Sequence, residues 1–350
     1  MFCAKTPFTA AGPLSMQTKP NQHSLNRSLL LTALLLGSAM NSAQAADGLY
    51  VLLNGSNAIK TYIPPSSAGT VFTSGGYLSN PAGMAFDSAG NLFVSNHASS
   101  TITKYAFTGG VLSSIGTLFA DSSSGVVSPW GLAFDSAGNL FLANTGGIEK
   151  FAYSGGSFST GTVFASRPGH AIFRLAFDSM GSLFATDASD TTLTKFTAIG
   201  GVLSNTGTTF ANMDGRGLAF DNTGSLFMSR TNNTIVKFTA TAGVLSSIGT
   251  LFSSSGLNNP YSLAFDSMEN LFVANSISGN ITEFASAGGV LSSTSTTFAR
   301  GPTLGDLAFA PSAVAPSAVP EPGTAFLLAI GGATLALKRR MKGAFVELQA

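Results

Sequence analysis

One fourteen-residue stretch recurs along this chain and limits what it can fold into. Residues 131–144 read Gly-Leu-Ala-Phe-Asp-Ser-Ala-Gly-Asn-Leu-Phe-Leu-Ala-Asn, and close copies begin at Gly83, Arg174, Gly217 and Ser262, with a broken copy at Asp306. The phenylalanine of the motif falls at positions 86, 134, 177, 220, 265 and 309, so the period is 43 to 48 residues. A repeat of this length is typical of one four-stranded blade of a β-propeller.

Each copy predicts the same four strands. Leu-Ala-Phe is the first strand, and the Asp-Ser-Ala-Gly-Asn that follows is a tight turn in which Gly90 and Gly138 are free to adopt a positive φ. A second apolar strand, a third strand such as 102–105, and an outer strand of the type Gly-Thr-Leu-Phe complete the unit. The inner strands are nearly continuous apolar runs, which is typical of strands buried on both faces.

The two ends of the repeat region complement each other. Residues 49–53, 59–63 and 70–73 match strands two, three and four of a blade that lacks its first strand, whereas 306–311 supplies only a first strand. We therefore expect an all-β, six-bladed propeller of four-stranded blades over residues 46–312, with one blade completed by the N-terminal and C-terminal strands. This closure leaves no free sheet edge between the ends of the ring.

The repeat also resembles a known family. Residues 129–144, Pro-Trp-Gly-Leu-Ala-Phe-Asp-Ser-Ala-Gly-Asn-Leu-Phe-Leu-Ala-Asn, resemble the NHL repeat of six-bladed propellers and, more loosely, the strands of gluconolactonase-type and lyase-type propellers. The likeness extends over about 270 residues of the chain. It implies the fold but no activity, because such propellers host both enzymes and binding platforms.

Residues 1–45 are predicted to be a secretory signal peptide. An apolar run from Leu29 to Leu36 precedes Ala43-Gln44-Ala45, which has the small-residue pattern of a cleavage site at Ala43 and Ala45. The basic residues of the first part are Lys5, Lys19 and Arg27. This part is long, so Met16 is an alternative start to Met1. The other interpretation is an N-terminal membrane anchor, which the shortness of the apolar run disfavours.

The C-terminal end resembles a PEP-CTERM sorting signal. A linker at 313–318 leads into the signal at 319–342, and a tail at 343–350 is longer than the family pattern. The residues that carry the resemblance are Val319, Pro320, Glu321 and Pro322, an apolar run over 323–337, and Lys338, Arg339 and Arg340. The resemblance implies a transmembrane sorting helix with the basic cluster inside, followed by processing by an exosortase. Exosortase and the secretion machinery are therefore expected partners, and the membrane-anchored precursor is expected to reach the cell surface or the extracellular space.

Composition excludes some functions. Charged residues are 9% of the chain and the net charge is +1, which argues against nucleic-acid binding because such proteins carry a clear basic excess. The single cysteine, Cys3, lies in the predicted leader, so the exported part has neither a disulfide nor a thiolate ligand. No cofactor is expected.

Catalytic candidates are few. Asp87, Asp135, Asp178, Asp221 and Asp266 share one repeat position and are expected to hold turns. The remaining acids near a possible site are Asp187, Asp190, Asp214 and Asp306, and the histidines outside the leader are His97 and His170. A histidine in these loops is either a general base or a plain polar loop residue, and no G-x-S-x-G motif occurs. We assign no catalytic residue and no metal ligand, so an enzyme is disfavoured.

Two columns of repeat positions are better candidates for a binding site. Ala82, Trp130, Phe173, Arg216, Tyr261 and Gly305 precede the first strand, and Asn96, Asn144, Asp187, Arg230 and Asn275 follow the second. Both columns should lie around the same mouth of the central channel. Aromatic faces with Arg and Asn donors suit a sugar or an acidic glycan. The predicted ligand-binding residues are Trp130, Phe173, Tyr261, Arg174, Arg216, Arg230, Asn96, Asn144 and Asn275. The alternative is that the aromatic residues pack the blade junctions and the asparagines bond loop backbone.

These observations favour an exported propeller of the cell surface or extracellular matrix that acts as a non-catalytic binding or scaffold protein, with exopolysaccharide or surface proteins as partners. Two alternatives stay open. One is a lactonase-like or lyase-like propeller enzyme acting on a sugar derivative, and the other is a purely structural matrix protein.

Overall fold

The computed structural model describes residues 48–311. The predicted signal peptide, linker, sorting signal and tail lie outside the described residues. Within 48–311 the only helical elements are two 3-10 turns, η2 (Asn54–Ser56) and η3 (Ser122–Ser124), and the rest of the secondary structure is strand. No helix in this part of the chain has the length and apolar character needed to cross a membrane.

The strands form five principal antiparallel sheets. Four of these sheets have four strands each, in the order β26-β1-β2-β3, β4-β5-β6-β7, β16-β17-β18-β19 and β20-β21-β22-β25. The fifth has six strands in the order β15-β14-β13-β12-β9-β8, and two short hairpins, β10-β11 and β23-β24, stand apart from the sheets. The bounds of the first two sheets are β1 (Leu49–Leu53), β2 (Ala58–Tyr62), β3 (Thr70–Ser74), β26 (Leu304–Phe309), β4 (Pro81–Phe86), β5 (Leu92–Asn96), β6 (Thr101–Thr108) and β7 (Val111–Ala120).

The remaining strands follow the same pattern. The six-stranded sheet comprises β8 (Leu132–Phe134), β9 (Leu140–Phe151), β12 (Thr162–Phe177), β13 (Leu183–Asp187), β14 (Thr192–Ile199) and β15 (Val202–Ala211). The last two sheets comprise β16 (Leu218–Phe220), β17 (Leu226–Ser229), β18 (Ile235–Thr241), β19 (Val244–Ser253), β20 (Pro260–Phe265), β21 (Leu271–Asn275), β22 (Asn280–Phe284) and β25 (Thr296–Arg300). The hairpins are β10 (Tyr153–Ser154) with β11 (Ser157–Phe158), and β23 (Ser286–Ala287) with β24 (Val290–Leu291).

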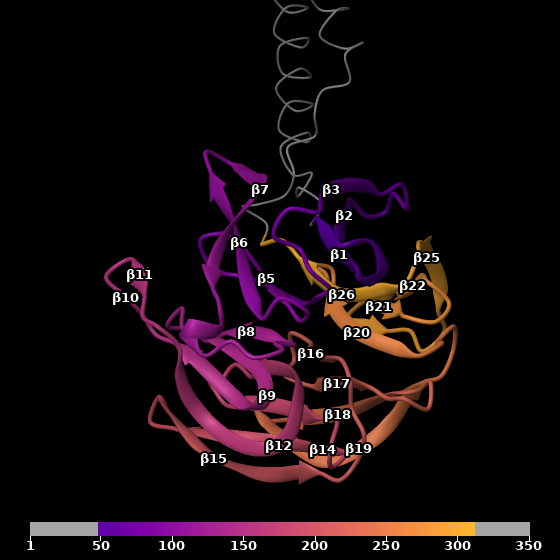
Figure 1. Ribbon diagram of the computed structural model, residues 1–350. Coiled ribbons are helices and arrows are strands. Elements are labelled where there is room, and N and C mark those ends of the chain that lie inside the picture. The colour runs from indigo at the N-terminus through magenta and orange to yellow at the C-terminus, as the bar shows by residue number, and fades with distance from the viewer. Residues whose placement is uncertain (1–47, 312–350) are drawn as a thin grey trace, which may run out of the picture. The chain divides into compact units, whose positions relative to one another are not determined.

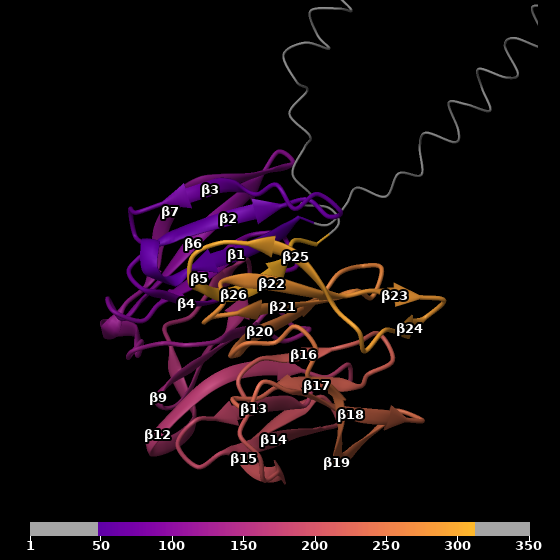
Figure 2. The ribbon, with the colours of Figure 1, turned by 90° about the vertical axis from the view of Figure 1, so that its right-hand side faces the viewer.

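The sheets surround a common axis, so the fold is a β-propeller. Figure 1 shows β8, β16, β20 and β26 toward the centre of the ring and the last strands β7, β15, β19 and β25 at its periphery. In the view turned by 90°, the hairpin β23–β24 projects from the body of the ring (Figure 2). The predicted all-β propeller is confirmed at this level.

The predicted count of six separate blades is not confirmed, because two copies of the repeat share the six-stranded sheet. The segment between the second-strand asparagine and the third-strand isoleucine is shorter in the second copy, 145–147, than in the first, where it includes 97–100 and the first residue of β6. Gly146 and Gly147, both at positive φ, carry β9 through this point without a break. The long β12 then pairs with β9 at Thr162–Ser166 and with β13 at Ile172–Phe177, which merges the two copies.

The predicted closure of the ring is present. Strand β26 pairs antiparallel with β1, with Leu49 opposite Phe309 and Tyr50 opposite Ala308. The sheet β26-β1-β2-β3 thus joins the two ends of the described chain. The backbone N–H of Ala310 also donates to the carbonyl oxygen of Gly48, at 2.9 Å.

The phenylalanine of the motif contacts the preceding repeat. Six edge-to-face ring pairs occur in equivalent positions, with centroids 5.1–5.5 Å apart and interplanar angles of 65–72°. They are Tyr50–Phe86, Phe93–Phe134, Phe141–Phe177, Phe184–Phe220, Phe227–Phe265 and Phe272–Phe309. Each such pair contributes roughly 0.5–1.5 kcal/mol beyond the area it buries. The recurrence of this phenylalanine is therefore explained by packing between repeats.

The aspartate that follows the motif has the predicted turn role. Oδ1 of Asp87 accepts the backbone N–H of Ala89 at 3.0 Å and that of Asn91 at 2.8 Å. The corresponding bonds recur at Asp135, Asp178, Asp221 and Asp266. These five carboxylates are therefore committed to turns at the end of the first strands.

Candidate functional site

One repeat position defines a tightly packed layer near the axis. It holds Gly83, Gly131, Arg174, Gly217, Ser262 and Asp306. A Cβ atom at Gly83 would come within 3.0 Å of the carbonyl oxygen of Trp130, and one at Gly131 within 3.0 Å of that of Phe173. Glycine is therefore required where the first strand of one repeat approaches the backbone of the next.

Arg174 and Asp306 occupy this layer. Nη2 of Arg174 lies 3.5 Å from Oδ1 of Asp306, and both side chains are buried. Oδ2 of Asp306 accepts the backbone N–H of Met84 at 2.8 Å, and Oδ1 accepts Ser262 Oγ at 2.5 Å and the backbone N–H of Leu307 at 3.1 Å. Asp306, one of the four acids near the predicted mouth, thus joins the closing strand to its two neighbouring sheets.

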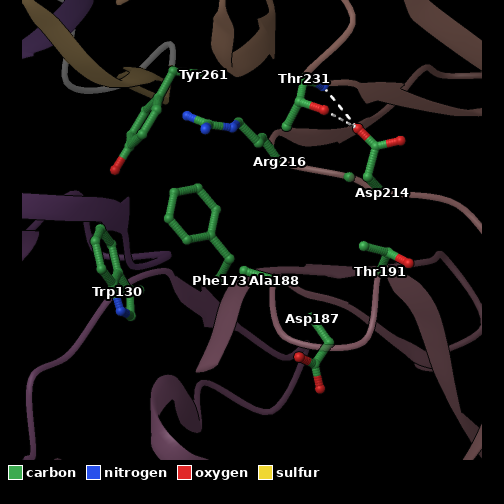
Figure 3. A pocket seen from close by; sticks show the side chains of 10 residues that line it. Trp130, Phe173, Asp187, Ala188, Thr191, Asp214, Arg216, Thr231 and Tyr261 are labelled. Carbon is green, nitrogen blue, oxygen red and sulfur yellow. Dashed lines mark hydrogen bonds between the residues drawn. The ribbon is translucent and has the colours of Figure 1, made fainter. Parts of the chain in front are cut away.

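The cavity lies beside this layer, at the end where the chain enters the first strands. Its volume is about 370 Å³ (Figure 3). It is lined by Trp130, Phe173, Asp187, Ala188, Thr191, Asp214, Gly215, Arg216, Thr231 and Tyr261. The structure therefore brings together every member of the first column that has a side chain larger than a methyl group.

The aromatic residues of the cavity also contact one another. The ring centroids of Trp130 and Phe173 are 4.8 Å apart, and those of Phe173 and Tyr261 are 5.1 Å apart. The ring centroid of His97 lies 4.3 Å from that of Trp130. Burial raises the pKa of the Tyr261 hydroxyl, and the nearby positive charge of Arg174 only partly offsets this effect. The hydroxyl of Tyr261 is therefore protonated at neutral pH and is able to donate a hydrogen bond.

Two predicted arginines have partners within the protein. Arg174 is 5% exposed and does not line the cavity, and its guanidinium carbon lies 4.9 Å from the ring centroid of Phe173 and 5.0 Å from that of Tyr261. Arg230 holds Asp214, with Nη2 and Nε at 2.5 Å and 3.1 Å from Oδ1. Thr231 donates to Oδ2 of Asp214 from its backbone and its hydroxyl.

These bonds control the ionisation of Asp214. Burial pushes the pKa of its carboxyl upward, but the hydrogen bonds from Thr231 and Arg230 together outweigh burial and hold the pKa below its usual 3.8. The carboxylate is therefore charged at neutral pH and is compensated by Arg230.

A second charged cluster contacts the cavity through Asp187. Nδ1 of His170 lies 2.8 Å from Oδ2 of Asp187, and Nη2 of Arg167 lies 2.9 Å from Asp190. Potential ligand atoms of His170, Asp187 and Asp190 lie within 4.8 Å of one another, which is compatible with a cation. Arg167, however, already lies within 4.0 Å of both carboxylates and supplies the positive charge there.

The three predicted asparagines hold loops instead of lining the cavity. Asn96, Asn144 and Asn275 are buried, and Oδ1 of each accepts a backbone N–H from the preceding loop, at 2.9–3.1 Å. The alternative in which these residues bond loop backbone is what the structure shows. Thr191 and Thr231 were missed by sequence reasoning, although each follows a residue of the second column by a few positions.

Comparisons with known proteins bear on the sorting signal and on the fold. Residues 318–340 match the family described as the PEP-CTERM protein-sorting motif. The chain thus carries a signal for exosortase processing of an exported, membrane-anchored precursor sorted to the cell surface. No curated protein matches the sequence.

Solved structures resemble the ring. A chain of a nidogen/laminin complex has a TM-score of 0.60 and 17% identity, with 76% of this chain and 99% of that chain covered. A virginiamycin B lyase from Staphylococcus aureus has a TM-score of 0.48 and 14% identity (71% and 84% covered), and a gluconolactonase from Xanthomonas campestris has 0.49 and 17% (65% and 78% covered). At these identities the likeness concerns the fold alone.

Proposed function

We propose that this protein is a cell-surface propeller that binds polysaccharide in the cavity without catalysing a reaction. The observation that carries the proposal is the meeting of Trp130, Phe173, Tyr261 and Arg216, which come from different repeats, around one cavity. Flat rings receive the C–H faces of a sugar, and Arg216 with the two threonine hydroxyls supplies hydrogen-bonding groups for its oxygens. The volume falls within the range of roughly 300–1,000 Å³ of small-molecule sites.

The direction of the chain supports this proposal. In β20, Tyr261 stands at the start and Phe265 at the end of the strand, so the cavity and the aspartate turns lie at opposite ends of the ring. Phe309 and Pro311 lie with the turn residues Asp221 and Asp266 around the other end. The described chain therefore ends, at Pro311, on the side of the ring opposite the cavity.

The count of repeats belongs to the proposal. We count the six-stranded sheet as two fused blades, which gives six repeat units of NHL type. The six equivalent edge-to-face ring pairs support this count, because each marks one junction between repeats.

Binding of the exported protein to a panel of neutral and acidic polysaccharides tests the function. Trp130→Ala should weaken binding by up to about tenfold, which corresponds to about 1.4 kcal/mol. Tyr153→Ala is the matched control, because Tyr153 is an exposed aromatic residue on β10 outside the cavity. If no polysaccharide binds, or both variants behave alike, the proposal is wrong.

The enzymatic alternative has one observation in its favour. His170 bonds Asp187, and Asp187 lines the cavity, which is an arrangement suited to a general base. A polysaccharide recovered unchanged after long incubation with the protein is the outcome expected of a binding protein. Turnover that is lost in His170→Ala would establish the enzyme instead.

A further inference from the structure

Arg216 carries a positive charge that has no ion-pair partner among the described residues. No carboxylate among residues 48–311 lies within ion-pair distance of its guanidinium group. The side chain lies over the ring of Tyr261, whose centroid is 5.8 Å from the guanidinium carbon. The side chain is half-buried and points toward Tyr261 across the cavity (Figure 3).

The two acids of the cavity do not balance this charge. Asp214 is bound by Arg230 and by both donors of Thr231. Asp187 accepts His170 at one oxygen and the backbone N–H of Ser189 at the other, and Figure 3 shows its carboxylate turned away from Arg216. Every carboxylate on the cavity wall is therefore already occupied.

A second guanidinium group lies beside the cavity. Arg174 lies against the same Tyr261 ring, at 5.0 Å. Its Nε and Nη2 atoms are buried and donate no hydrogen bond within residues 48–311, and Asp306, its counter-ion at 3.5 Å, is shared with three other donors. The ring of Tyr261 thus contacts one half-buried and one buried guanidinium group.

We infer that the cavity takes a sugar residue that carries a carboxylate, a uronic acid, with the carboxylate on Arg216. This inference rests on the proposed polysaccharide binding and names its ligand class. A guanidinium group binds a carboxylate through two parallel hydrogen bonds, and this geometry discriminates against an uncharged group. The sugar ring then lies against Phe173 and Trp130, on the side of the cavity next to Arg216.

The test compares an oligogalacturonate with its methyl ester, in which each carboxylate is replaced by an uncharged ester group. The unaltered protein should bind the acid at least about tenfold more tightly at low salt, and this preference should shrink at high salt. In Arg216→Gln the preference should disappear while the ester still binds as before. Arg300→Gln is the control, since Arg300 is an exposed arginine at the end of β25 that does not line the cavity.

The outcomes separate the two proposals. Equal binding of acid and ester by the unaltered protein, or a preference that survives Arg216→Gln, overturns the uronate inference and leaves polysaccharide binding standing. Binding of neither compound, nor of any other polysaccharide, overturns both. Tighter binding of benzoate than of galacturonate also overturns the inference, because it identifies an aromatic acid as the ligand. If Arg216→Gln does not fold, the acid–ester comparison on the unaltered protein decides alone.

Discussion

Arg174 and Asp306 form a buried ion pair, Nη2 to Oδ1 at 3.5 Å, between β12 and the closing strand β26. Asp306 has three further donors, whereas Nη1 of the Arg174 guanidinium donates to the carbonyl oxygen of Phe173 at 3.5 Å. The charge of Arg174 therefore depends on the ion pair for its compensation more than the charge of Asp306 does.

Removal of the acid should be the costlier change. Asp306→Ala leaves a buried guanidinium uncompensated, and we expect it to lower the free energy of unfolding by about 3–5 kcal/mol. Arg174→Met should cost clearly less, because the carboxylate keeps its donors from Met84, Ser262 and Leu307. Urea denaturation of both variants measures the difference. Equal losses, or a larger loss for Arg174→Met, would contradict this account of the layer.

The glycines of the layer should tolerate no side chain. At Gly83 an added Cβ would meet the backbone of Trp130, which cannot move aside as a flexible side chain would. Gly83→Ala should therefore destabilise the protein by roughly 1–3 kcal/mol. Gly55→Ala is the control, since a Cβ there has no neighbour within 4 Å. Similar unfolding midpoints for the two variants would show that the layer is looser than described.

The repeat predicted much of the fold because it encodes local structure. Strand periods, the aspartate turns and the complementary half-blades at the two ends are all properties of short segments, and the structure confirms them. The sequence also predicted that four residues would meet, because they occupy the same repeat position and equivalent positions of a ring converge at one mouth of the central channel. They are Trp130, Phe173, Arg216 and Tyr261.

The remaining features depend on contacts between segments. The fusion of two repeats follows from the continuity of β12, which pairs with β9 at one end and with β13 at the other, and no single segment specifies both pairings. The burial of Arg174 depends on the small residues at four of the other five positions of its layer and on Asp306 across the axis. The asparagines point into their own loops, a choice of rotamer that their spacing does not encode.

Low pH should destabilise the wall of the cavity, because it protonates Asp214. Because its folded-state pKa lies below the usual 3.8, its contribution to stability is fully present above that value and is lost as the pH falls toward the folded-state pKa. The unaltered protein should consequently lose more stability between about pH 5 and about pH 2 than Asp214→Asn does. Melting temperatures across this range provide the measurement, and parallel pH profiles would rule out the role given to this carboxylate.

The sorting motif should determine where the protein is found. Deletion of residues 319–350 should remove the membrane-associated precursor and release the protein, because the apolar run and the basic cluster are lost together. Replacement of Lys338, Arg339 and Arg340 by glutamine should reduce the membrane-associated precursor without abolishing it. Fractionation of producing cells separates the membrane-associated precursor from the released protein, and an unchanged distribution after the deletion would count against the motif.

The most direct test of the central claim uses Trp130, which is the only tryptophan of the chain and lines the cavity. Its fluorescence reports on that wall without any label. Titration of the exported protein with oligogalacturonate should change the emission of Trp130 until the site is saturated. The change should be absent in Tyr261→Ala, because that variant removes an aromatic ring from the cavity wall. A folded protein whose emission stays constant across acidic and neutral oligosaccharides would contradict the claim that this cavity is a carbohydrate site.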